Sequence, residues 1–521
     1  MRFRHVLAGA ALATAATLPL PAFAQGAAPA YAGTAASSAR ARPGMAASGA
    51  VASTSTSTST STSTSTSTST STSTSTSLPD EQHGAESPSI AAGRYLATAA
   101  DCAACHTAQR DKPFAGGYPI SSPMGTIYST NITPSMHGGI GDYTEADFAR
   151  AVRQGVRRDG RHLYPAMPYA SYAALTDKDI HALYAYFRQA VVPVDTATPG
   201  THLPFPFSVR AAMSAWNALF LDSKPFRADP GASTLVNRGA YLTNALEHCG
   251  ACHTPRNALM GPNDAHAFAG GSLGNWYAPN ISSDPGSGIG GWTDAELTRY
   301  LKTGRVPGKA QAAGPMAEAI DHSLQYLSDA DVAAIVAYLK QTRPMHDGET
   351  MPRYAYGRPL DESALRGNAT PPSRGWRIFS GSCAACHQVD GAGVGNHDYP
   401  SLYHNTATGA ARPDNLIATI LFGVQRGTGG KPVFMPAFGP SASFTDRLSD
   451  QDVADVANFV LLQYGNPGVK VNAADVATIR QGGKPPLIVQ AGHYALPGLA
   501  LAIALLVFMF VRRRRSRANP A

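Results

Sequence analysis

Three copies of one short motif contain all six cysteines of this 521-residue chain. The copies are Cys102-Ala-Ala-Cys105-His106, Cys249-Gly-Ala-Cys252-His253 and Cys383-Ala-Ala-Cys386-His387. A c-type haem is bound through thioether bonds to such a cysteine pair, and the histidine that follows is placed to ligate the iron. A zinc site would need two such pairs brought together, and thiol exchange does not need three copies. The sequence therefore predicts three covalently bound c-type haems and leaves no cysteine for a disulfide.

The N-terminal residues have the pattern of an export signal. Arg2 and Arg4 precede an apolar stretch, and Ala22-Phe23-Ala24 matches a cleavage site. We expect a signal peptide over residues 1–24, and an uncleaved N-terminal anchor is the alternative. Haem attachment outside the cytoplasm agrees with export.

A low-complexity stretch follows the signal peptide. Serine and threonine alternate from Ser53 to Ser77. Because this run offers no apolar side chain to bury, it cannot offset the entropy lost on ordering. The sequence predicts a disordered spacer over residues 25–87, with no role in electron transfer.

Residues 494–511, near the C-terminus, carry no charge, and four consecutive arginines, 512–515, follow them. A stretch of this length is just sufficient to cross a bilayer core. Flanking positive residues stay on the cytoplasmic side, so we expect a transmembrane anchor with the haem-bearing part in the periplasm. A buried core helix is the alternative.

The arginines of the leader and of the tail account for the formal net charge of +7. The positive charge therefore reflects the membrane topology of the chain and does not indicate a nucleic-acid partner.

The region between the two ends repeats three times, once around each motif. Each unit opens with a glycine close to an aromatic residue: Gly93 and Tyr95, Gly239 and Tyr241, Gly375 and Trp376. Each unit closes with a run in which Thr or Ser stands three residues before Asp: Thr176 and Asp179, Ser328 and Asp331, Ser449 and Asp452. This is the signature of a helix N-cap. A glycine in the first helix and an aromatic residue in the second let two helices cross closely over a haem.

The first two units share a long Gly/Pro-rich insertion after the motif, which the third unit lacks. It runs from Gly116 to Thr144 in unit 1 and from Gly270 to Thr293 in unit 2. We expect loops that wall a ligand. Asn131 lies in an N-x-S/T pattern in the first insertion and Asn280 in the second, and we interpret both as hydrogen-bonding loop residues rather than glycan sites.

A second axial ligand is needed by each iron that transfers electrons without binding substrate, and methionine is the usual choice opposite histidine. We expect one methionine in each unit in a Pro-flanked loop shortly before the closing helix: Met167, Met316 and Met435. His322 is a rival ligand in unit 2. Met124 and Met136 are weaker rivals in unit 1.

Three arginines in Gly-containing turns ahead of these methionines are candidate partners for haem propionates, although each is equally well explained as a surface residue: Arg157, Arg305 and Arg426.

From residue 91 onwards the chain resembles the triple-haem cytochrome c subunits of bacterial membrane-bound dehydrogenases that oxidise alcohols, gluconate, fructose or sorbitol. The resemblance rests on these segments: Ser129-Thr-Asn-Ile-Thr-Pro134, Gly139-Ile-Gly-Asp-Tyr-Thr-Glu145, Met167-Pro-Tyr-Ala-Ser-Tyr172, Leu203-Pro-Phe-Pro-Phe207, Trp216-Asn217 and Met435-Pro-Ala-Phe438. It implies a subunit of the respiratory chain, itself not catalytic, that accepts electrons from a quinoprotein, flavoprotein or molybdenum-type catalytic subunit and passes them to ubiquinone. The expected place is the bacterial inner membrane.

The expected architecture is mainly α. It consists of three tandem class I cytochrome c domains, at 88–195, 230–345 and 370–465, and a C-terminal transmembrane helix. Two other functions remain open: a membrane-anchored electron carrier that serves a terminal oxidase without a dehydrogenase partner, and a multihaem peroxidase or reductase with one open iron position. Trp216, between units 1 and 2, is either an exposed docking residue or inter-domain packing, and we favour packing.

Overall fold

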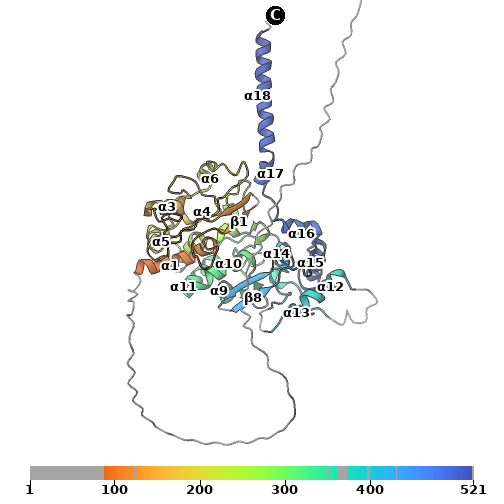
Figure 1. Ribbon diagram of the computed structural model, residues 1–521. Coiled ribbons are helices and arrows are strands. Elements are labelled where there is room, and N and C mark those ends of the chain that lie inside the picture. Colours follow the sequence, from red (N-terminus) through yellow and green to blue (C-terminus); the bar gives the residue numbers. More distant parts are fainter. Residues whose placement is uncertain are drawn as a thin grey trace, which may run out of the picture.

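The computed structural model describes residues 87–122, 124–349, 351–361, 372–395, 399–429 and 431–518. The predicted signal peptide and nearly all of the predicted spacer lie outside these residues. Helices dominate the described part, and the only sheets in it are four two-stranded antiparallel hairpins. Figure 1 shows the three units side by side in chain order, with a long helix projecting from them.

Helices predicted at the two ends of each unit are present. Unit 1 has α1 (Pro88–Ala99), the motif helix α2 (Cys102–His106), α3 (Glu145–Gln154), α4 (Tyr169–Tyr172) and α5 (Asp177–Gln189). Unit 2 has α7 (Thr234–Tyr241), the motif helix α8 (Cys249–His253), α9 (Asp294–Thr303), α10 (Gly314–His322) and α11 (Asp329–Leu339). Unit 3 has α12 (Arg374–Ile378), the motif helix α13 (Ala384–His387), α14 (Asp414–Phe422) and α15 (Asp450–Tyr464). A π-helical turn follows α7 and another follows α12, at Leu242–Leu246 (η1) and Phe379–Cys383 (η6).

The closing helices begin at the predicted caps. The side chains of Thr176, Ser328 and Ser449 each accept a hydrogen bond from the backbone N–H three residues later. Such a cap satisfies one of the free N–H groups of the first turn.

The opening glycines allow the close helix crossing that the sequence predicts. A Cβ atom at Gly93 would lie 2.0 Å from the Ala182 carbonyl oxygen of α5. At Gly239 it would lie 1.9 Å from a carbonyl oxygen of α11, and at Gly375 2.2 Å from one of α15. No side chain fits at these distances, so glycine is required at all three crossings.

The insertions contain short hairpins, whereas we expected only loops. The hairpin β1 (Pro119–Ser122) and β2 (Gly125–Tyr128) lies in unit 1, and β3 (Gly271–Leu273) and β4 (Trp276–Ala278) in unit 2. Two more precede the methionines of units 2 and 3: β5 (Arg305–Val306) with β6 (Ala310–Gln311), and β7 (Val424–Thr428) with β8 (Lys431–Met435). Asn131 and Asn280 are buried in the insertions, where each side chain bonds backbone groups, as predicted.

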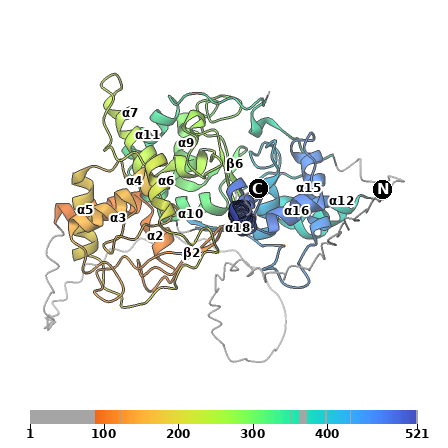
Figure 2. The same ribbon diagram turned by 90° about the horizontal axis from the view of Figure 1, so that it is seen from above.

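Units 1 and 2 share one hydrophobic core, whereas unit 3 has its own. A single cluster of buried side chains runs from Leu96 and Phe187 of unit 1 to Leu246 and Ile335 of unit 2. The core of unit 3 is a separate cluster around Phe379, and it also includes side chains of α16 (Ala473–Arg480). Figure 2 shows α12, α15 and α16 together at one end of the molecule, away from α1 and α5.

Reciprocal tyrosine–aspartate contacts join units 1 and 2. The Tyr95 hydroxyl on α1 donates to Asp331 at the start of α11, with 2.6 Å between the oxygens. In the opposite direction, the Tyr241 hydroxyl on α7 donates to Asp179 at the start of α5. Since the two tyrosines are equivalent in the repeat and so are the two aspartates, the units are related by an approximate twofold axis.

Trp216 packs between the units, as we favoured. It lies on α6 (Ala212–Phe220), is buried, and makes an edge-on ring contact with Tyr169 of unit 1. Its indole nitrogen donates to the Leu259 carbonyl of unit 2, at 3.2 Å. The connection between units 1 and 2 is therefore held in place by both.

The C-terminal α18 (Ala495–Ala518) follows α17 (Leu487–His493) and extends away from the three units (Figure 1). Its side chains from Leu501 to Val511 are all uncharged and exposed. Among the residues that the structure describes, no helix is both long enough and apolar enough to cross a membrane.

Candidate functional site

In units 1 and 2 the motif forms a short helix that places its two cysteines on the same face, whereas Cys383 of unit 3 ends η6 and directly precedes α13. Residues three and four apart are neighbours on a helix surface. In α2 and α8, therefore, both cysteines and the histidine of the motif face the same way. All six cysteines are partly buried and free of disulfides. Burial raises the pKa of Cys102 to about 12, so a free thiol there is protonated at neutral pH.

The three motif histidines are all held by the same kind of hydrogen bond. Nδ1 lies 2.6 Å from the Thr130 carbonyl oxygen in His106, 2.7 Å from that of Pro279 in His253 and 3.0 Å from that of Pro400 in His387. A carbonyl only accepts, so Nδ1 carries the proton and Nε2 presents its lone pair. Burial lowers the pKa of all three, to about 4 for His253. A neutral imidazole with one nitrogen fixed in this way suits metal ligation at the other.

The three candidate methionines lie in three different local structures. Met167 is in the turn before α4 and Met435 ends β8. Met316 lies in the first turn of α10, so the expected loop is found at Met167 but not at Met316 or Met435. All three side chains are partly buried and pack against the hydrophobic clusters of their units. The three methionines therefore differ in backbone conformation, but each lies at the edge of a hydrophobic core.

The rival ligands are less suitably placed. Met136 is 65% exposed, whereas Met124 is partly buried in the turn of the first hairpin. His322 is exposed at the end of α10, six residues after Met316. Six residues correspond to about 1.7 helical turns, so the two side chains lie on different faces of α10.

The three arginines have different environments. Arg157 has 39% of its side chain exposed and pairs with Asp159 at 3.4 Å. Arg305 is partly buried on β5. Arg426 is 1% exposed, and its guanidinium donates to the Ala312 carbonyl and the Gln311 side chain of unit 2, at 2.8 and 3.0 Å. This arginine therefore joins units 2 and 3, and propionate pairing by any of the three stays a prediction.

Trp292 provides a test of whether the surroundings fit a haem. Its ring is buried against Tyr300, Tyr354 and Lys309. Its indole N–H is buried without a hydrogen-bond partner in the described part of the chain. An indole nitrogen can only donate, and a buried donor without an acceptor costs about 1–3 kcal/mol. A bound group with an oxygen acceptor, such as a haem propionate, would satisfy it, so the residues present fit a haem.

The cytochrome c family model matches three separate stretches of the chain, residues 90–190, 236–343 and 372–463, and each stretch contains one motif. The chain belongs to the cytochrome c family. The matches assign a haem-binding cysteine pair to each of the three domains of this cytochrome, so the three predicted haems are confirmed.

Several relatives of the cytochrome are cytochrome subunits of dehydrogenases. It is 47% identical over 454 residues to the fructose dehydrogenase cytochrome subunit of Gluconobacter japonicus, a match that covers 83% of this chain and 93% of the relative. It is 40% identical to the gluconate 2-dehydrogenase cytochrome c subunit of Pantoea cypripedii, over 78% of this chain and 92% of the relative. It is 38% identical to the cytochrome c subunit of the quinone alcohol dehydrogenase of Gluconobacter oxydans (strain 621H), over 77% and 84%. The cytochrome is therefore an electron-transfer subunit of the dehydrogenase-associated type, and the resemblance seen in the sequence is confirmed.

Sequence reasoning missed three ionisable residues that are buried or partly buried near the motifs. Asp101 directly precedes the first motif, and Glu247 stands two residues before the second. Arg353, between units 2 and 3, is 8% exposed and donates to the Asn280 carbonyl at 3.2 Å. Burial lowers the pKa of Arg353. The only sequence signal is their nearness to the motifs or linkers, and it does not indicate burial.

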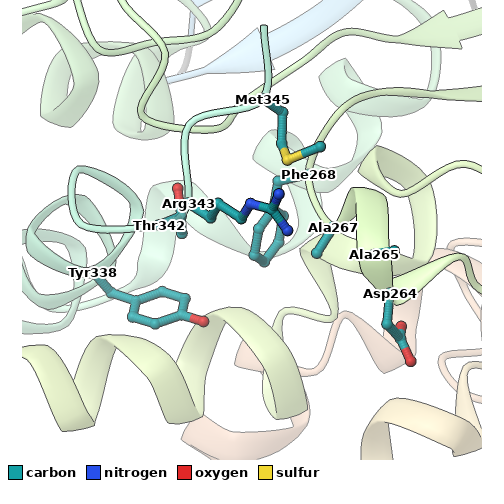
Figure 3. Close-up of a pocket in the computed structure, with 8 residues that line it drawn as sticks. All are labelled: Asp264, Ala265, Ala267, Phe268, Tyr338, Thr342, Arg343 and Met345. Atoms are coloured by element: carbon teal, nitrogen blue, oxygen red, sulfur yellow. The ribbon is translucent and has the colours of Figure 1, made fainter.

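Figure 3 shows a cavity of about 160 Å³ beside Phe268, Tyr338 and Arg343 of unit 2. Sites for small organic ligands commonly measure about 300–1,000 Å³. This cavity is too small to be a second ligand site of the cytochrome.

Proposed function

We propose that this cytochrome accepts electrons from the catalytic subunit of a periplasmic dehydrogenase and passes them through its three haems to ubiquinone. The observation that carries the proposal is the threefold arrangement of a cysteine pair and a histidine held through Nδ1. A partner with a catalytic subunit is supported by the relatives, three of which are named as dehydrogenase subunits. A quinone acceptor is supported by the name of the alcohol dehydrogenase relative.

Each domain prepares its haem site in the same way. The cysteine pair would bind the porphyrin, and the motif histidine would bind the iron through Nε2, because the backbone carbonyl holds Nδ1. Met167, Met316 and Met435 would be the second protein ligands of the three irons. Each bound haem supplies a one-electron redox centre, whose potential depends on ligand, burial and hydrogen bonding.

The proposal places α18 in the inner membrane. Exposed apolar side chains along Leu501–Val511 support this, because water does not favour such a surface. The arginines that follow are of the kind found on the cytoplasmic side of a span, which puts the haem domains in the periplasm.

The experiment that tests the partner is affinity purification of the tagged cytochrome from gently solubilised membranes, followed by mass spectrometry. Recovery of a large quinoprotein, flavoprotein or molybdenum-containing subunit in near-equal amount is the expected result, and it would identify the substrate class. Recovery alone, or with oxidase subunits, would contradict the dehydrogenase assignment and favour a carrier that serves a terminal oxidase.

Removal of residues 494–521 is expected to release the cytochrome from the membrane in soluble form with its three haems retained. The reason is that unit 3 packs against α16, whereas α18 extends away from the units. Fractionation of cells, with haem staining of each fraction, measures the release. In the control, alanine replaces Leu505 and Leu506, so that the chain keeps its full length. If the truncated protein remains with the membranes, α18 is not the anchor.

Replacement of Met316 by leucine is expected to remove the low-spin character of one haem in three. Leucine matches the size of methionine but has no sulfur to bind iron. Electron paramagnetic resonance and visible absorption of the oxidised protein report the spin state. His322→Gln is the matched control on the same helix and should leave all three haems low-spin. If His322→Gln changes the spectrum and Met316→Leu does not, the assignment in unit 2 is wrong.

A further inference from the structure

Two carboxyl groups, one buried and one partly buried, lie between the haem-attachment segments of units 1 and 2. Glu247 is only 8% exposed and accepts a hydrogen bond from the Ser323 hydroxyl, at 3.1 Å. Ser323 is completely buried and also approaches the Ala99 carbonyl of unit 1, at 3.4 Å. Asp101 has one side-chain oxygen that is buried without a hydrogen-bond partner among the described residues. These groups come from both units and are enclosed by the shared core.

The carboxyl pair adjoins two haem-binding cysteine pairs. Asp101 is bonded directly to Cys102, and Glu247 is separated from Cys249 only by His248. The His248 ring makes an edge-on contact with Tyr172 of unit 1, with 5.6 Å between the ring centroids. The two attachment segments therefore meet at this point.

No cation offsets the charge of these carboxyl groups within the described part of the chain. The ionisable groups that act on Glu247 are Asp101 of unit 1 and Asp331 of α11, and both are acidic. Tyr172, His248 and the cysteines face the same space and carry no positive charge, because burial lowers the pKa of His248 to about 4. Two cations of the described residues lie near these groups, and neither is paired with Glu247 or Asp101: Arg238 is paired with Asp331, and Arg256, which acts on Cys252, donates to the Ala251 carbonyl at 2.6 Å. Burial first, and then the charge of Asp101, raise the pKa of Glu247 well above its usual value, whereas the Ser323 hydroxyl acts in the opposite direction.

We propose that Glu247, with Asp101 beside it, is a proton-binding site that is coupled to the electron content of the first two haem domains. Glu247 binds a proton when a neighbouring domain gains an electron, and it releases the proton when the electron leaves. The electron comes from the dehydrogenase, and the proton is taken from water and returned to it, so only one O–H bond forms and breaks. An added electron lowers the net positive charge nearby, which makes a carboxylate harder to keep ionised. This inference requires electron transfer through bound haems and does not depend on ubiquinone as the acceptor.

Redox titration of the purified holoprotein from about pH 5 to about pH 9, a range above the usual glutamate pKa, tests the proposal. In the wild type, the midpoint potential of one or both of the first two haems should fall as pH rises. In Glu247→Gln, that dependence should be lost. The third haem serves as an internal reference, because Gly381 and Ser382 precede Cys383 and do not titrate in this range.

Glu296→Gln is the matched control, since it removes one carboxylate from the same unit. Burial acts to raise the pKa of Glu296, but hydrogen bonds from Lys309 and Thr293 lower it overall. Glu296 therefore stays ionised over the whole range, and its loss should leave the slope unchanged. A wild-type potential that does not vary with pH, or a slope that persists in Glu247→Gln, would overturn the proposal.

Ser323→Ala provides an independent test in case Glu247→Gln does not fold. Loss of the hydroxyl removes the hydrogen bond that favours the ionised form of Glu247. The pH range over which the potential falls should therefore move upward. A range that stays in place would overturn the proposal, because Glu247 would not be the titrating group.

Discussion

Gly239→Val is expected to unfold units 1 and 2 together. A Cβ atom at this position would lie 1.9 Å from the Ala334 carbonyl oxygen, so α7 and α11 would have to separate. Overpacking a core costs about 1–3 kcal/mol and occasionally more, and this contact is at the severe end of that range. Because units 1 and 2 share one hydrophobic core, separation of the two helices exposes both units. Thermal unfolding, followed by circular dichroism and by the visible haem bands, measures the effect.

Gly375→Val is the matched variant in unit 3, where a Cβ atom would lie 2.2 Å from the Asp455 carbonyl oxygen. Its effect should be confined to unit 3, which has a separate core. Gly427→Ala is the neutral control, since no atom lies within 4 Å of the added Cβ. The shared core would be refuted if Gly239→Val unfolded only one of the first two units.

Asp331→Asn is expected to lower the free energy of unfolding by about 2–3 kcal/mol at neutral pH, because hydrogen bonds to charged groups are worth about 1.5–3 kcal/mol. The Asp331 side chain accepts two hydrogen bonds from Arg238, both at 2.8 Å, and one from Tyr95 of unit 1. Burial acts to raise the pKa of Asp331, but these hydrogen bonds outweigh burial and lower it. Denaturant unfolding at several pH values measures the loss.

The sign of the pH dependence follows from the lowered pKa. A carboxyl group whose pKa is lower in the folded state makes its full contribution to the stability of the fold at pH values above its pKa in the unfolded chain, about 3.9. The contribution is lost as pH falls below that value through the folded pKa, so wild type and Asp331→Asn should converge in strong acid. Asp452→Asn is the control, since its partner Arg374 has 59% of its side chain exposed. An exposed pair contributes about 0–1 kcal/mol, and an equal loss in both variants would contradict the special role of Asp331.

Local features of this cytochrome could be predicted from the sequence. The caps at Thr176, Ser328 and Ser449, and the glycine crossings, depend on residues whose preferences are set by the backbone nearby. Asn131 and Asn280 were predicted to be hydrogen-bonding loop residues, as the structure shows, whereas their burial was not predicted. Threefold repetition made each of these signals stronger than a single copy would be.

Contacts between units could not be predicted in this way. Tyr95 and Asp331 are 236 positions apart, and periodicity does not indicate that two units will dock. The hairpins were missed because their strands are only two to five residues long, too short for an alternating pattern. Met316 was expected in a loop because a proline precedes it, but proline is also accepted in the first turn of a helix. The burial of Glu247 depends on the same docking of units 1 and 2.

The shared core divides this cytochrome into two exchangeable blocks rather than three. Residues 88–345 bury one continuous core, so neither of the first two units can be replaced by its counterpart from another cytochrome without a mismatched surface. Unit 3 forms a separate block together with α16, and α18 follows in the same piece of chain. A hybrid joined between residues 346 and 371 would keep the first core whole and bring a new third unit with its own C-terminal helix, but that unit would need an equivalent of Arg426, which donates to Ala312 and Gln311 of unit 2.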